Sequence, residues 1–215
     1  AWPLTLAFCL FVANLAIALF ADRGSTKSPA SPSETRQHEH LAYQDMSANF
    51  ARLAWVANLG GAFSMSMMIH LFPKLAVELG VPSEQHGIMI AMSRIVTIAT
   101  YVAMHHLKFW HHRFSTALLT QAFAVAGLLT IANATAVLGL CLGLGALSLM
   151  MGYNYFAGIY YTTTGSADER KGAANGIHEA TIAMGFGCGS LIGGLIGQQF
   201  GVRTPYLLGA GVIVI

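Results

Sequence analysis

The chain has 215 residues, of which 55% are hydrophobic and only 9% are charged, and its formal net charge is +2. A soluble domain carries about 25% charged residues, so this chain could not cover a water-facing surface and we expect lipid to be most of its solvent. The small net charge gives no reason to expect a nucleic-acid partner. The three cysteines lie in apolar runs, which is typical of packing residues and not of a disulfide framework. The composition therefore predicts an all-α, polytopic membrane bundle, for which we expect no cofactor.

Because a bilayer core needs about 20 apolar residues per helix, the apolar runs predict seven membrane-spanning segments. In chain order these are residues 2–21, 50–79, 84–104, 114–133, 135–161, 172–200 and a last segment that starts at Pro205. We expect the second segment to be tilted or broken near Gly60-Gly61 and to end at Pro73. The chain begins without a methionine and stops within an apolar run, so we expect it to be a piece of a longer protein.

Residues 22–49 form the one long polar segment, rich in serine, proline and charge at its start. This predicts a flexible linker, with a surface helix near residues 41–48. Lysine and arginine indicate the orientation of a chain in the membrane, because loops rich in them face the cytoplasm. Of the loop cations only Lys74 and Arg203 fall on the side opposite the linker. We therefore expect a plasma (inner) membrane protein whose linker, loop 105–113 and turn 168–171 are cytoplasmic.

Four glycines at a strict spacing of four, Gly185, Gly189, Gly193 and Gly197, lie on the predicted helix 172–200. Glycine is a poor helix former, by about 1 kcal/mol relative to alanine. A stripe of glycines allows transmembrane helices to approach each other backbone to backbone. The stripe therefore predicts a packing and gating ridge against a neighbouring helix.

The acidic and basic turn 168–171, closing on Gly172, and the glycines that follow it up to Phe200-Gly201 resemble helix eleven of the major facilitator superfamily of transporters. The whole chain fits the same frame. Residues 1–21 are similar to helix six, the last helix of the N-terminal bundle; residues 22–49 to the central cytoplasmic loop; and residues 50–215 to the C-terminal six-helix bundle with its last helix truncated. The family's loop pattern between helices eight and nine keeps only its basic end here, at Arg113. The resemblance implies alternating access, with the missing N-terminal half of the same protein as partner.

Arg94 lies at the middle of the predicted segment 84–104. A charge at the centre of a bilayer costs from about 3 kcal/mol upward, so it persists where it faces a cavity or a partner. This favours an anion-binding or charge-relay role in a transport path. The alternative is a structural pair with an acid elsewhere in the protein.

Glu179 is the only acid well inside a predicted helix, and desolvation could let such a carboxylate carry a coupling proton. The alternative, slightly favoured, is a carboxylate that reaches cytoplasmic water or pairs with a loop arginine. His70, nearer the outer end of its helix, is a second candidate proton group.

Asn58 lies beside the Gly60-Gly61 weak point, and interrupted helices near the midplane are where transporters place binding sites. Tyr153 and Asn154 lie deep in the predicted helix 135–161, and the family's tenth helix faces the central cavity. We therefore take Asn58, Asn154 and Tyr153, with Arg94, as candidate substrate-binding residues. Interhelical hydrogen bonding is about as good an interpretation.

His105, His106, His111 and His112 lie within eight residues and raise a second hypothesis, a membrane di-iron oxidoreductase with a histidine cluster. The spacing disagrees with the histidine boxes of those enzymes, and no nearby carboxylate orients the rings. We therefore expect no metal site and no enzyme.

The function that we expect is secondary transport of a small solute by alternating access, coupled to an ion, which we expect to be a proton. A transport-inactive receptor or scaffold with the same fold stays open as an alternative.

Overall fold

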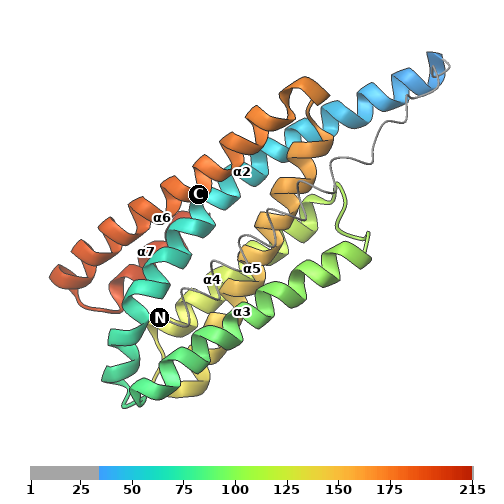
Figure 1. The fold of residues 1–215 in the computed structure, drawn as a ribbon. Coiled ribbons are helices and arrows are strands. Elements are labelled where there is room, and N and C mark those ends of the chain that lie inside the picture. The colour runs from blue at the N-terminus through green and yellow to red at the C-terminus, as the bar shows by residue number, and fades with distance from the viewer. Residues whose placement is uncertain (1–33, 215) are drawn as a thin grey trace, which may run out of the picture. The chain divides into compact units, whose positions relative to one another are not determined.

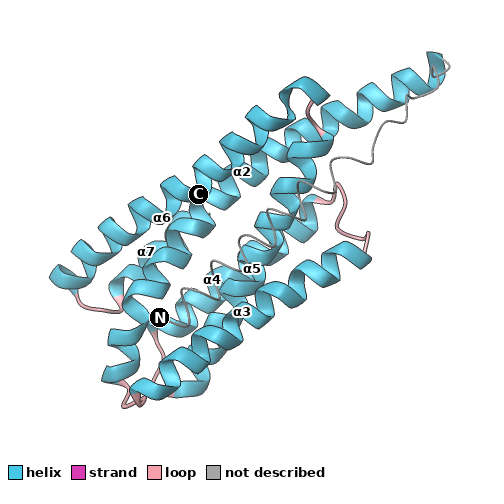
Figure 2. Cartoon of the chain, viewed as in Figure 1, coloured by secondary structure: helices cyan, strands magenta, loops and turns pink. Residues whose placement is uncertain are grey.

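The computed structural model describes residues 34–214, with side chains from residue 41 onward. The chain divides into two compact units, residues 1–38 and 39–215. The predicted first segment and the start of the predicted linker lie outside the described residues. Every regular element of the described part is a helix, as Figure 2 shows.

The described helices follow one another through short connections. They are α2 (Glu34–Glu78), α3 (Ser83–His106), α4 (Phe114–Ala132), α5 (Val137–Thr164), the 3-10 turn η2 (Asp168–Arg170), α6 (Lys171–Phe200) and α7 (Thr204–Val214). By length and composition α3, α4, α5 and the segment Asp168–Phe200 can each cross a membrane, and α7 is a shorter apolar helix. The chain is therefore an all-α membrane protein in its described part.

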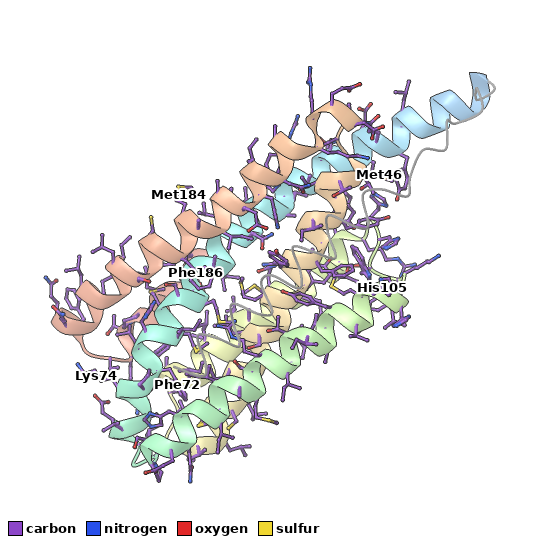
Figure 3. The ribbon with its side chains drawn as sticks, in the orientation of Figure 1. Met46, Phe72, Lys74, His105, Met184 and Phe186 are labelled. Carbon is purple, nitrogen blue, oxygen red and sulfur yellow. The ribbon has the colours of Figure 1, made fainter. Side chains whose placement is uncertain are left out.

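Helix α5 is the centre of the bundle, since it packs against α3, α4 and α6. Helix α7 packs against α4 and α6, and Figure 1 shows α6 running beside α2. The side chains of the main core come from α2, α4, α5 and α7, including Phe72, Leu128, Leu144 and Tyr206. Figure 3 shows Met184 on the outer side of α6, where it is exposed, and Phe186 on the side that packs against this core.

Helix α2 differs from the sequence prediction in three ways. It is continuous through Gly60-Gly61, and it runs past Pro73 to Glu78, so the predicted end at Pro73 is wrong. Proline is tolerated inside transmembrane helices because neighbouring groups satisfy the backbone that it frees. The two glycines make room for neighbours: a Cβ at Gly61 would lie 2.9 Å from the Met150 sulfur. The helix begins at Glu34, so the second half of the predicted linker is helical and continuous with α2.

A smaller cluster closes one end of the bundle. It contains Trp110 from the loop after α3, together with Met104, Tyr153 and Tyr161. The indole Nε1 of Trp110 donates to the Met104 carbonyl oxygen at 3.0 Å, which holds the loop against the end of α3.

Candidate functional site

Two charged residues lie exposed on one side of the bundle, within helices that can span a membrane. Arg94 is on α3 and Glu179 is on α6. Tyr101, two helical turns after Arg94, lies on the same side of α3, and its ring centroid is 6.0 Å from that of Tyr155 on α5. The Tyr155 hydroxyl donates to Glu179 Oε1 at 3.2 Å. We call these four residues the Arg94–Glu179 face.

The two charges of this face are not paired with each other, because the ion pair found among the described residues is that between Lys171 and Asp168. Both charges nevertheless act electrostatically on the Tyr101 hydroxyl. A cavity of about 410 Å³ begins beside the two tyrosines and continues along α5 toward its C-terminal end. It is lined by Tyr101, Tyr155, Phe156, Ile159, Tyr160, Thr163 and Thr164. The face thus offers a cation, a carboxylate and phenol hydroxyls beside an apolar hollow.

The predicted binding residues Asn58 and Asn154 lie on the other side of α5, buried in the bundle. Asn154 accepts a hydrogen bond from Gln121 Nε2 at 2.7 Å and donates through Nδ2 to the Ala57 carbonyl oxygen at 3.1 Å. Asn58 Nδ2 donates to the carbonyl oxygens of Ala54 and Asn154, both at 2.9 Å. These amides join α2, α4 and α5 to one another, which is the interhelical role that the sequence left open.

Tyr153 and Asn154 also line a second cavity, of about 260 Å³, between α2, α4, α5 and α7. Its walls are mostly apolar, and the Tyr153 hydroxyl lies 3.2 Å from the Thr116 hydroxyl. Because the side-chain polar groups that line this cavity already have hydrogen-bond partners, it offers a solute little beyond apolar contact. Their predicted part in substrate binding stays a prediction.

The four striped glycines lie directly against α2. A Cβ at Gly185 would lie 2.5 Å from the Leu59 carbonyl oxygen, and one at Gly189 would meet the Phe63 carbonyl oxygen. Beside this contact the Ser66 hydroxyl donates to the Phe186 carbonyl oxygen at 2.7 Å and lies 2.6 Å from the Ser190 hydroxyl. The stripe therefore sets the distance between α6 and α2, while its predicted part in a conformational cycle stays a prediction.

The loop histidines divide into two pairs. His105 and His106 are exposed at the end of α3. His111 stacks on the Tyr160 ring at 4.6 Å, and His112 Nε2 lies 3.0 Å from the Ser47 hydroxyl on α2. In the part of the chain that the structure describes, no three histidine, cysteine or acidic side chains gather as they would around a metal ion.

His112 ties the loop to the ends of two helices. Its φ angle is +52°, and its backbone N–H donates to the Tyr161 hydroxyl at 2.7 Å. Burial lowers the pKa of His112 below its usual 6.5, and the neighbouring His111 lowers it further. Burial also lowers the pKa of His111, with a smaller contribution from Lys108. Both rings are therefore held in the neutral form more strongly than a free histidine.

Two other predicted residues lie apart from the Arg94–Glu179 face. His70 is exposed on α2, and Arg113 is exposed at the N-terminus of α4, where its carbonyl oxygen accepts a hydrogen bond from the Thr116 hydroxyl at 2.7 Å. Sequence reasoning missed Tyr101 and Tyr155. The spacing of seven residues from Arg94 could have indicated Tyr101, whereas no local signal places Tyr155 beside Glu179.

No family model, no curated protein and no solved structure matches this chain. The site is therefore interpreted from its own geometry.

Proposed function

We propose that this chain belongs to a secondary transporter that moves a small solute across the membrane by alternating access, coupled to protons. The observation that carries the proposal is the Arg94–Glu179 face, where two charged residues without an ion pair among the described residues lie within helices that can span a membrane. A charge at the bilayer centre costs from about 3 kcal/mol upward, and such residues mark substrate and ion pathways.

In this proposal Arg94 binds an anionic group of the solute, and the tyrosine hydroxyls orient it. The hollow beside Tyr101 and Tyr155 receives the apolar part of the solute. Glu179, held by the Tyr155 hydroxyl, exchanges the coupling proton. The glycine contact between α6 and α2 supports the proposal, since closely packed backbones allow helices to slide past each other during rocking.

The proposal also takes the chain as the C-terminal half of a twelve-helix protein, with residues 1–21 from the preceding bundle. The series of helices joined by short loops supports this. So does the fact that three segments meet at one end of the bundle. Ser47, the loop at His112 and the end of α5 at Tyr161 meet there. These are the segments to which the positive charges of the sequence assigned one side of the membrane.

The test uses the full-length protein in proteoliposomes that contain a pH-sensitive dye. Organic acids and amino acids, which carry a carboxylate, are added in turn outside, and at least one class is expected to drive a change of internal pH. Arg94→Ala should abolish this change, and Glu179→Gln should abolish it while keeping solute exchange. Lys108→Ala, which removes an exposed loop cation, is the matched control. No response to any class, or a normal response in Arg94→Ala, would contradict the proposal.

A further inference from the structure

Helix α6 meets the bundle through one side that is almost bare of side chains. Its buried residues within the described structure are His178, Gly185, Gly189, Gly193 and Gly197. His178 precedes Gly185 by seven residues and so lies on the same side of the helix. It is the one titratable group on this contact face of α6, and neither the substrate nor the proton role proposed above uses it.

His178 packs into a gap that a glycine of α5 leaves open. A Cβ at Gly158 would meet His178 Cε1, and it would lie 2.7 Å from His178 Nδ1 and 2.8 Å from Asn58 Nδ2. The imidazole and the Asn58 amide therefore lie next to each other where α2, α5 and α6 meet. Both side chains are fully buried.

Three polar atoms at this junction are left without hydrogen bonds. Among the described residues neither ring nitrogen of His178 has a hydrogen-bond partner, and the same is true of Asn58 Oδ1. The orientation of the Asn58 amide follows from its Nδ2, which donates to two carbonyl oxygens. A buried polar group without a partner is costly, so such a group calls for a ligand or a function.

The charged and titratable neighbours of His178 are few in the described structure. From α5 the Tyr155 ring lies 5.5 Å from the imidazole, and on α6 the adjacent Glu179 acts on it electrostatically. From α2 the neighbour is the uncharged Asn58. The Glu179 carboxylate is exposed and accepts a hydrogen bond from the Tyr155 hydroxyl, so it lies outside the junction.

We propose that His178 is a proton-binding site that controls the docking of α6 on α5 and α2. A neutral imidazole fits the junction, because an uncharged ring is far less costly to bury than a charged one. A protonated imidazole brings a charge and two N–H donors into a fully buried position where, among the described residues, neither ring nitrogen has a hydrogen-bond partner. Protonation therefore drives the N-terminal half of α6 away from Gly158 and toward water, where the ring is solvated. The inference concerns conformation and does not require the transport activity proposed above.

The experiment measures the distance between α6 and α2 as the pH changes. Met184 and Val56, both exposed, are replaced by cysteine and spin-labelled in the full-length protein, after Cys9, Cys141 and Cys188 are changed to serine. Double electron–electron resonance then gives the distance distribution at pH 8 and at pH 5.5, without any solute. A second, longer distance should grow as the pH falls.

Two variants show which side chain binds the proton. His178→Gln keeps a polar side chain but cannot take up a proton, so it should show the same distribution at both pH values, whereas Glu179→Gln should keep the pH-dependent change. If the spin-labelled protein that keeps His178 shows the same distance distribution at pH 8 and at pH 5.5, the proposal is overturned. This outcome is decisive even if His178→Gln fails to fold. A change that persists in His178→Gln, or that disappears only in Glu179→Gln, would also overturn it.

Discussion

Gly189 provides the sharpest test of how α6 is held against α2. The perturbation is Gly189→Ala, the smallest change that adds a side chain. The added Cβ would meet the carbonyl oxygen of Phe63 and would lie 2.9 Å from both its carbonyl carbon and its Cα. These are backbone atoms of a helix, which cannot rotate away as a flexible side chain can. The two helices must therefore separate to admit the methyl group.

The magnitude follows from two opposing effects. Overpacking of a close contact costs about 1–3 kcal/mol, while alanine in place of glycine favours a helix by about 1 kcal/mol. Gly187 is the matched control, because it lies on the same helix, is exposed, and has no described atom near the position of an added Cβ. Gly187→Ala has only the favourable effect. Because both variants gain the same helix-forming preference, they should differ by the overpacking cost alone, about 1–3 kcal/mol in the free energy of unfolding.

The assay is thermal unfolding of the detergent-solubilised protein, followed by the loss of monodisperse protein in size-exclusion chromatography. In a chain of this size 1 kcal/mol corresponds to about 2–4 °C, so Gly189→Ala should melt at least about 2 °C below Gly187→Ala. Equal melting temperatures, or a more stable Gly189→Ala, would refute the reasoning that this glycine sets the contact between α6 and α2.

Two further predictions concern groups outside the Arg94–Glu179 face. Because the pKa of His112 is lowered in the folded protein, the neutral ring stabilises the fold at neutral pH, and this stability should be lost as the pH falls below about 6.5. His112→Asn, which tolerates the left-handed backbone, should reduce the fall in melting temperature between pH 7.5 and pH 5, and an unchanged fall would exclude His112 as its cause. Asn154→Ala leaves Gln121 Nε2 and the Ala57 carbonyl oxygen without their partner, so it should lower the unfolding free energy by about 1–3 kcal/mol for each group left buried and unpaired. A melting temperature equal to that of the unchanged protein would show that water replaces the amide.

The positions of α3, α4, α5 and α6 agree closely with the sequence prediction, because apolar runs of spanning length are a local property of the chain. Pro73 shows where local reasoning fails. Rules for proline come from helices in water, whereas in α2 neighbouring helices can satisfy the freed backbone, and the helix continues to Glu78.

From the sequence, only the two charged residues of the candidate site could be predicted. Arg94 and Glu179 stand out in the sequence because charges are rare inside apolar helices. That Tyr155 joins them depends on how α5 is rotated against α3 and α6, which no local pattern specifies. Asn58 and Asn154 were equally visible as polar residues, but their hydrogen bonds to backbone and side chains of neighbouring helices belong to the tertiary structure.

The proposed function depends most on the Arg94–Glu179 face being a transport site. The most direct measurement is solute-driven pH change in proteoliposomes, compared between the full-length protein and its Arg94→Ala variant at equal amounts of reconstituted protein. We expect a response with at least one class of organic acid or amino acid, and its loss in Arg94→Ala. A response of equal size in both proteins would contradict it.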